Sequence, residues 1–460
     1  MTFSHGRSLI GRVVRSAIVA ALVALPSIKG SALARPASAS SSTLRIWYGS
    51  DDPTEQAWAT DLANRFAATH ASIKVQFSFY DLDDMNDKTQ LALNTDNPPD
   101  LIYSTPRGPG LPSYVHAGKL LDLTAEARKR GWAGQLRPGL LAGYNNLLDA
   151  AGTASDVGKV YAVPYLLAAD GVLYNKDIFS RLHLQVPKTV GQFAALLPRL
   201  KQAGYTPLGF GNEDAWVGDA WYLALLNAQA GPTALRPALR LAPSFSFAAP
   251  PFRRAAATLQ SWARAGYFSP QFGGLDPQEA IEDFFENGRT AMQLVSSTEG
   301  SQILTEVHDD DSKAKNVGLF AFPSTTGRQP VMVWDGYTGW AIPRASHNPA
   351  AALDFIDFAV SASTANTLLA HGLLPARKIN PAAVKTAAPF QHEYLTVLAS
   401  ARQGVYLDAA PIPNFLATME AQLQQLLAGK ESPAALTHTL QSAYASHGRT
   451  ARFADTDGEF

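Results

Sequence analysis

The sequence predicts an α/β fold with a mostly parallel sheet, and three observations support this. Strand and helix patterns alternate over residues 44–103 at the spacing of βαβ units. The alternation starts again after about residue 165, as a second α/β unit would. The 460 residues are 46% hydrophobic and 17% charged, which is enough apolar material for packed cores and too little charge for a disordered chain.

The first unit shows clear helix and strand periodicities. Trp58, Leu62 and Phe66 recur at i, i+4 and i+8, which places them on one face of a helix. Residues 73–79 alternate apolar and polar side chains, as a half-buried strand does. The predicted order is a strand over 44–48, a helix from 53, a strand over 73–79, a helix over 87–94 that stops before Pro98, and a strand over 101–103.

The later part of the chain continues this alternation. A predicted helix ends at Gly204, a residue type typical of helix C-termini. The predicted elements are strands over 172–174, 208–210, 317–322 and 339–342, and helices over 190–203, 252–265, 280–287, 350–361 and 415–427.

The first residues have the layout of a secretory signal peptide. Three arginines, up to Arg15, precede an apolar run over 16–28, and small residues follow in the patterns Ala32-Leu33-Ala34 and Ala37-Ser38-Ala39. The apolar run is shorter than the roughly 20 residues that span a bilayer. We therefore expect a signal peptide over 1–34, with cleavage as late as 39, and a periplasmic protein; a retained membrane anchor is the alternative.

Composition excludes several functional classes. The chain has no cysteine, so disulfides, thiolate metal sites, cysteine nucleophiles and an N-terminal lipid anchor on cysteine are excluded. The net charge of −1 provides no long-range attraction to nucleic acid or to anionic lipid. We expect no nucleic-acid partner.

Polar side chains follow two of the predicted strands. Residues 48–52 come at the end of the first strand, and residues 104–107 come at the end of the third. In open α/β sheets, ligands bind beyond the carboxyl ends of the strands. This edge of the sheet is therefore the predicted ligand site.

Several short segments carry a family resemblance. They are residues 98–102 (PPDLI), 158–164 (GKVYAVP), 173–177 (LYNKD), 287–292 (NGRTAM), 335–343 (DGYTGWAIP) and 372–377 (GLLPAR). In this order and spacing they resemble the carbohydrate-type extracellular solute-binding proteins of ABC importers, the group that includes maltose-binding protein. The resemblance runs from about residue 44 to about residue 445.

The resemblance implies a periplasmic-binding-protein-like fold, in which two α/β lobes made of discontinuous segments are joined by a hinge and enclose one solute. The implied N-terminal lobe is 44–165 with 330–373, the implied C-terminal lobe is 166–329 with 374–448, and residues 449–460 form a flexible tail. The implied function is to capture a sugar or small oligosaccharide and deliver it to the transmembrane subunits of an ABC permease. A monomer without enzymatic activity, cofactor or metal is expected.

Two positions depart from the family pattern. Thr298 stands where the family commonly has an aromatic residue that stacks on a sugar, and Asp335 stands in place of the first glycine of the return segment. The sugar preference of the family therefore does not carry over, and a malto-oligosaccharide is not implied.

A sugar site needs two kinds of side chain. Charged and amide groups bind the hydroxyls through strong hydrogen bonds, and flat aromatic rings cover the apolar C–H faces. Trp216 is the predicted stacking ring, in a run of aromatic and acidic residues over 212–221. The predicted ligand-binding residues are Tyr48, Asp51, Glu55, Ser104, Thr105, Trp216, Asp219, Thr298, Trp334, Asp335, Tyr337 and Arg377.

Structural alternatives exist for several of these residues. Asp51 is also placed to cap the next helix, and Ser104 or Thr105 to cap a turn. Trp221, five residues after Trp216, precedes several leucines and is expected in the core. Arg377 is equally consistent with a solvated or ion-paired arginine.

Other motifs do not fit the sequence. Residues 81–87 look like a calcium loop but lack its glycine and its final glutamate, so they are expected to be a solvated loop or a helix start. The histidines lack zinc-site spacing, and no nucleophile-elbow or phosphate-loop motif is present.

Two alternative functions stay open at this point. One is a secreted glycoside hydrolase that uses two carboxylates, for example Asp51 with Glu213. The other is a receptor for a non-sugar solute, such as a polyol phosphate or a polyamine. The mixture of aromatic and acidic residues favours the sugar.

Overall fold

The computed structural model describes residues 42–50, 53–106, 110–145, 158–297, 316–380, 384, 389–407, 410, 412 and 414–448. The predicted signal peptide over 1–34 and the predicted tail over 449–460 lie outside these residues. Within the described part, no helix has the length and apolar character needed to cross a membrane.

Strands and helices alternate in the first part of the chain, as predicted. They are β1 (Ser42–Gly49), α1 (Pro53–Thr69), β2 (Ile73–Tyr80), α2 (Leu82–Ala92), β3 (Leu101–Ser104), α3 (Leu111–His116), α4 (Thr124–Arg130), α5 (Trp132–Gln135), α6 (Leu140–Tyr144) and β4 (Ala162–Asn175).

The middle segment is mostly helical. Its elements are α7 (Lys176–Arg181), α8 (Val190–Gln202), β5 (Thr206–Gly209), α9 (Trp216–Ala230), α10 (Pro232–Leu235), η1 (Arg236–Arg240), α11 (Pro250–Arg264), η2 (Phe272–Gly274), α12 (Pro277–Glu282), the π-helix η3 (Asp283–Asn287) and β6 (Thr290–Ser296).

The last segment returns to the sheet and ends in helices. Its elements are β7 (Val317–Phe320), β8 (Val331–Met332), β9 (Trp334–Ala341), α15 (Pro349–Ala359), α16 (Ala362–Ala370), β10 (Leu374–Pro375), α17 (Pro389–Ser400), β11 (Arg402–Gln403), α18 (Phe415–Leu427) and α19 (Pro433–Gly448).

Nine of the described strands form one sheet whose main order is β2-β1-β3-β9-β4-β6-β5, with β7 and β10 also pairing with β4, and β8 and β11 form a separate parallel pair. The pairs β1/β2, β1/β3 and β5/β6 are parallel. The pairs of β9 with β3 and β4, and of β4 with β6, β7 and β10, are antiparallel. The expectation of a mostly parallel sheet is therefore wrong. The α/β class is confirmed, but β9 returns from far along the chain and runs against its neighbours.

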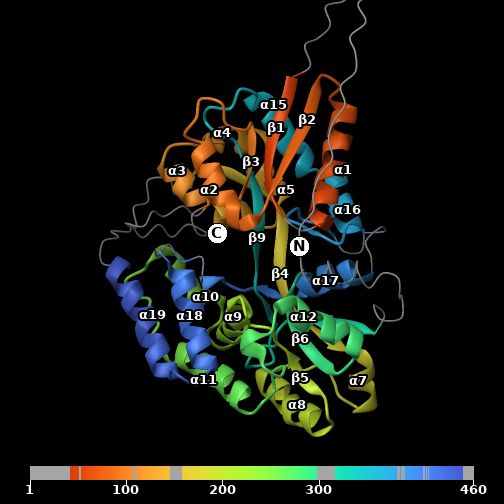
Figure 1. The fold of residues 1–460 in the computed structure, drawn as a ribbon, viewed down its shortest axis with the longest axis vertical. Helices are drawn as coiled ribbons and strands as arrows, with labels where there is room; N and C mark the ends of the chain where they lie inside the picture. The colour runs from red at the N-terminus through yellow and green to blue at the C-terminus, as the bar shows by residue number, and fades with distance from the viewer. Residues whose placement is uncertain are drawn as a thin grey trace, which may run out of the picture. The chain divides into compact units, whose positions relative to one another are not determined.

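Strand β4 connects the two ends of the sheet. Its first residues, from Ala162 to Ala169, pair with β9, and its last residues pair with β6 and β7 (Figure 1). Register shifts interrupt the pairing with β9 between Pro164 and Leu166 and between Leu166 and Leu167. The predicted strand over 172–174 is thus only the last part of a 14-residue strand.

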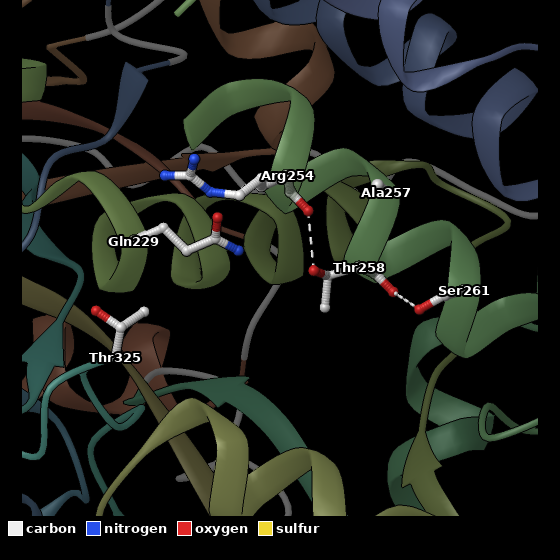
Figure 2. Close-up of a pocket in the computed structure, with 6 residues that line it drawn as sticks. All are labelled: Gln229, Arg254, Ala257, Thr258, Ser261 and Thr325. Atoms are coloured by element: carbon white, nitrogen blue, oxygen red, sulfur yellow. Dashed lines mark hydrogen bonds between the residues drawn. The ribbon is translucent and has the colours of Figure 1, made fainter. Parts of the chain in front are cut away.

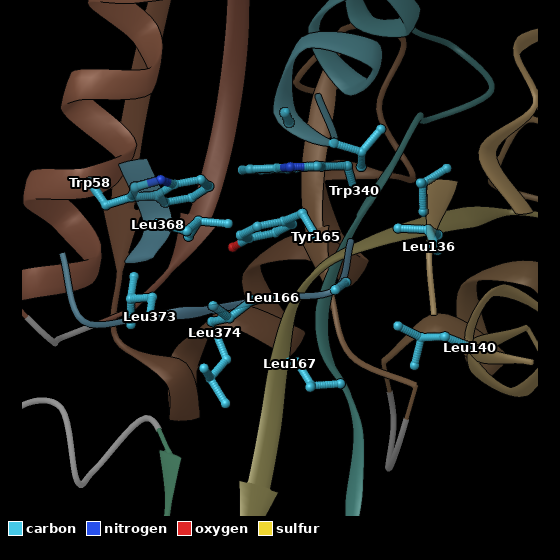
Figure 3. Close-up of a cluster of buried hydrophobic side chains, with 14 of the residues drawn as sticks. Trp58, Leu136, Leu140, Tyr165, Leu166, Leu167, Trp340, Leu368, Leu373 and Leu374 are labelled. Carbon is cyan, nitrogen blue, oxygen red and sulfur yellow. The ribbon is translucent and has the colours of Figure 1, made fainter. Parts of the chain in front are cut away.

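The first hydrophobic core packs around β1, β3, β9 and the start of β4. Figure 3 shows Tyr165 of β4 beside the rings of Trp58 and Trp340, to which it is stacked at centroid distances of 5.0 and 4.7 Å. Helices α1 and α15 join this core through Phe66 and Phe355, whose rings lie 5.2 Å apart. The helix face predicted from Trp58, Leu62 and Phe66 is confirmed, because all three are fully buried.

The second hydrophobic core packs around β5, β6, α8, α9, α11 and α18. Trp221 of α9 lies at its centre with no exposed surface, 6.0 Å from the rings of both Phe193 and Trp262. The expectation that Trp221 belongs to the core is confirmed. The predicted lobe boundaries stay a prediction, and the first core includes Tyr394 of α17, which lies beyond the predicted end of the N-terminal lobe.

Candidate ligand-binding site

The sheet register places several predicted site residues along one edge. Strand β3 ends at Ser104, which pairs with Gly339 of β9. The β4/β9 ribbon continues past this point to the pair Ala169 and Trp334. Five residues of strand at ~3.4 Å each extend the ribbon roughly 17 Å beyond the end of β3. The ends of β1 and β3 are therefore flanked by a ribbon that carries Trp334.

Glu55 lies in the first turn of α1, directly after the end of β1. It is only 5% exposed, and its Oε2 accepts a hydrogen bond of 3.4 Å from the Tyr48 hydroxyl. The Tyr165 hydroxyl in turn donates to the Tyr48 oxygen at 2.6 Å. Burial raises the pKa of both phenols above its ordinary value, and the nearby Glu55 raises it further. Both hydroxyls are therefore protonated, and able to donate, at neutral pH.

Tyr48 is buried at the end of β1, and its predicted ligand contact stays a prediction. The sequence placed it among the ligand contacts, but it has no exposed surface in this structure. Leu44, Ile46 and Tyr48 alternate along β1 and all face the core, so the buried face of the strand simply continues to its end. Tyr48 therefore contacts Glu55 from the buried face of β1.

Trp334 opens strand β9 and is 9% exposed. The guanidinium carbon of Arg137, from the loop between α5 and α6, lies over its ring at 5.9 Å from the centroid. Burial lowers the pKa of Arg137 to about 10, which still leaves the side chain charged at neutral pH. This geometry is a cation–π contact. Sequence analysis missed Arg137, because nothing in its local pattern indicates that it meets a residue almost two hundred positions away.

Ser104 and Thr105 stand at the end of β3. Ser104 is buried, and its hydroxyl donates to the Gly339 carbonyl at 3.1 Å and lies 3.3 Å from the Tyr144 hydroxyl. Thr105 is half-buried, and its carbonyl accepts from the Leu111 amide. Ser104 therefore helps to hold β3, β9 and α6 together, and Thr105 is the more accessible of the two.

Trp216 and Asp219 stand in the first turn of α9. Trp216 is partly buried against the second core, and Asp219 is 5% exposed. Ala215, just before the helix, has a φ of 67°, a conformation that costs a non-glycine residue about 1–2 kcal/mol. The Asn212 side chain accepts from the Gly218 amide at 2.7 Å and fixes this turn. The helix start is thus held in a strained geometry, which is frequent at binding sites.

Several predicted residues are only partly described. Asp51 and Thr298 lie outside the described residues. The backbones of Asp335 and Tyr337 belong to β9, but their side chains are not described. Their predicted ligand contacts stay predictions.

Arg377 is half-buried and bound to other parts of the protein. Its guanidinium donates to Gln135 Oε1 and to the Val360 carbonyl, both at 2.7 Å. These contacts join the loop after β10 to α5 and to the end of α15. They give Arg377 a structural role.

A separate pocket of ≈ 580 Å³ lies between α9 and α11 (Figure 2). Thr258 and Ser261 donate their hydroxyl hydrogens to carbonyls of their own helix, at 2.8 and 2.7 Å. None of the residues that line this pocket is a predicted site residue. They are Gln229, Arg254, Ala257, Thr258, Ser261 and Thr325.

The segment that looks like a calcium loop in the sequence is the start of a helix in the structure. Residues 82–92 form helix α2. Within the described part of the chain, no group of three or more acidic or histidine side chains is arranged to hold a metal ion.

Solved structures share this fold. A chitin oligosaccharide binding protein superimposes with a TM-score of 0.73 and 21% identity, covering 89% of this chain and 99% of that protein. The GacH receptor of Streptomyces glaucescens superimposes with a TM-score of 0.68 and 18% identity, covering 90% and 100%. These matches show that the chain adopts the fold of the solute-binding proteins.

Sequence comparison agrees with the fold. The diacetylchitobiose binding protein DasA of Streptomyces coelicolor is 24% identical over 360 residues, which are 75% of this chain and 77% of that protein. The multiple sugar-binding protein of Streptococcus mutans is 22% identical over 57% of this chain and 59% of its own length. A family profile described as bacterial extracellular solute-binding protein matches residues 50–366. The chain therefore belongs to the bacterial extracellular solute-binding protein family.

Proposed function

We propose that this protein captures a sugar or small oligosaccharide outside the cytoplasm and delivers it to the transmembrane subunits of an ABC permease. Its similarity to the diacetylchitobiose and multiple sugar-binding proteins supports a carbohydrate ligand. The observation that carries the proposal is the edge beyond β1 and β3, where a carboxylate and an indole ring stand beside an extended β-ribbon.

The proposed ligand contacts match the two kinds of surface that a sugar presents, its hydroxyls and its C–H faces. The Glu55 carboxylate accepts hydrogen bonds from ligand hydroxyls, and the rings of Trp334 and Trp216 cover apolar C–H faces. Asp219 and Thr105 add polar contacts. Asp51, Thr298, Asp335 and Tyr337 complete the proposed set: Asp51, Glu55, Thr105, Trp216, Asp219, Thr298, Trp334, Asp335 and Tyr337.

We also propose the two-lobe arrangement implied by the sequence, with the long strand β4 passing from one lobe to the other. A ligand that contacts both lobes binds the closed form better and shifts the population toward it. The protein is proposed to act as a periplasmic monomer after removal of its signal peptide, without nucleic acid and without bond cleavage.

Thermal unfolding against a carbohydrate panel tests the proposal. A ligand present at 100 times its Kd adds about 2.7 kcal/mol to the free energy of unfolding, which is readily measured. For the sugar that binds, Trp334→Ala and Glu55→Gln are expected to weaken affinity at least tenfold in calorimetry. Arg254→Ala, in the separate pocket between α9 and α11, is the matched surface control and is expected to bind like the wild type.

Two results would overturn the proposal. One is the absence of any stabilising carbohydrate in a panel that includes neutral, amino and acidic sugars, together with binding of a polyamine or a polyol phosphate. The other is the release of reducing ends from an oligosaccharide, which would identify a glycoside hydrolase.

A further inference from the structure

We propose that Tyr165 is a positioning residue for the ligand site, because its hydroxyl, acting through Tyr48, orients the Glu55 carboxylate toward the ligand. This inference rests on the proposed function, in which Glu55 contacts the sugar. Tyr165 lies in the core and is 1% exposed, so it acts on the ligand only through other residues.

The pairing of β4 with β9 is locally irregular at Tyr165. The register shifts between Pro164 and Leu166 and shifts back between Leu166 and Leu167, so the two strands leave the irregular stretch in their original register. The Tyr165 carbonyl accepts a hydrogen bond of 2.9 Å from the Ala376 amide, which fixes the backbone there. The side chain points toward β1 and α1, where it contacts Tyr48 and Trp58.

The ring of Tyr165 is stacked with two indoles. The interplanar angle is 7° with Trp58 of α1 and 16° with Trp340 of β9 (Figure 3). These contacts restrict the ring and so keep its hydroxyl in one place. The stack therefore defines where the hydrogen-bond chain begins.

The chain of hydrogen bonds runs from β4 to the start of α1. Tyr165 donates to Tyr48 at 2.6 Å, which is short, and Tyr48 donates to Glu55 at 3.4 Å, which is long. A hydroxyl that accepts one hydrogen bond becomes a better donor for the next. The other titratable groups that interact with these two phenols are Tyr103 and Tyr144. Tyr48 thus presents an oriented donor to the Glu55 carboxylate.

Phenylalanine variants test this role while keeping the rings. With a carbohydrate that binds the wild type, Tyr48→Phe is expected to weaken affinity about tenfold, because a carboxylate loses its donor. Tyr165→Phe is expected to weaken it about threefold, because Tyr48 stays but is no longer polarised. Tyr444→Phe, at a buried tyrosine of the second core whose hydroxyl donates to the Ala242 carbonyl, is the matched control and is expected to leave affinity unchanged.

The pH dependence separates positioning from a general loss of stability. Affinity that depends on the Glu55 carboxylate falls on acidification, and a carboxylate that loses a donor is protonated more readily. The midpoint of this fall is therefore expected to move to higher pH in Tyr48→Phe and in Tyr165→Phe, but not in Tyr444→Phe.

Each outcome has a separate meaning. If Tyr48→Phe and Tyr165→Phe fold and bind with wild-type affinity and pH profile, the inference is wrong and the proposed function stands. If the wild type binds no carbohydrate, the proposed function itself is wrong. If affinity falls without a shift of the pH midpoint, the two tyrosines act by packing alone, which also contradicts the inference.

Discussion

At the scale of single residues, Asp100 of the motif Pro98-Pro99-Asp100 has a structural role. Its side chain has no exposed surface and accepts from the Arg45 amide at 2.9 Å, and from Ser346 Oγ and Asn348 Nδ2 at 3.2 Å. The carboxylate therefore joins β1 to the segment that precedes α15, which lies about 300 residues further along the chain.

Replacing Asp100 is expected to destabilise the protein. In Asp100→Ala these buried donors lose their acceptor, and the free energy of unfolding is expected to fall by about 3 kcal/mol. Asp96→Ala, at an exposed position of the same loop, is the control and is expected to change stability by less than about 0.5 kcal/mol. Urea denaturation measures both, and equal stabilities would contradict the role given to Asp100.

For single side chains, local sequence patterns predicted some positions but not the contacts between distant segments. The position of Glu55 beside the end of β1 follows from the local pattern, and so does the burial of Trp221. The alternation of Leu44 and Ile46 already indicated that Tyr48 faces the core. Nothing local indicated Tyr165 or Arg137, because their partners come from distant segments of the chain.

At the scale of elements, some boundaries were predicted closely, whereas the start of α2 was predicted five residues late and α9, α16 and α17 were not predicted. The helix over Phe415–Leu427 has the predicted ends, and the helix predicted over 190–203 ends one residue earlier. Asn175 of the LYNKD segment caps α7 by accepting from the Ile178 amide at 3.0 Å, which is a local signal. Strand β4 was underestimated, because all but one of its residues are buried and it has no alternating pattern.

Close packing between β9 and α6 depends on a glycine. A Cβ added at Gly339 would lie 2.8 Å from the Tyr144 hydroxyl and 2.9 Å from its ring. Tyr144 is fixed by its hydrogen bonds to Ser104, so it has little freedom to move away. The contact brings β9 close to the helix that supports the end of β3.

Gly339→Ala is accordingly expected to lower the free energy of unfolding by about 2 kcal/mol through overpacking. Gly134→Ala, in α5 with no atom within 4 Å of the new Cβ, is the matched control and is expected to be neutral or slightly stabilising. Thermal or urea unfolding of the two variants measures this difference. If Gly339→Ala is as stable as the wild type, Tyr144 moves easily and the overpacking is absent.

At the scale of the whole molecule, buried phenols determine stability in alkali. Burial raises the pKa of Tyr48, Tyr165 and Tyr222, whereas in the unfolded chain each ionises near its ordinary value of about 10. Above that pH the unfolded state binds fewer protons than the folded state. Stability is therefore fully present below about pH 10 and is lost as the pH rises further.

Each such phenol contributes a slope of about 1.4 kcal/mol per pH unit above its unfolded pKa. We expect the free energy of unfolding, measured in urea at pH 9, 10 and 11, to fall less steeply in Tyr222→Phe than in the wild type, by the contribution of one group. Parallel curves for the two proteins would show that Tyr222 ionises normally in the folded state.

The position of β9 in the sheet has a consequence for biosynthesis. This strand, Trp334–Ala341, lies between β3 and β4, which are made far earlier. A nascent polypeptide that ends before residue 334 lacks the piece that joins them, and joining segments so distant in sequence is slow. The first core therefore stays open until most of the chain has left the ribosome.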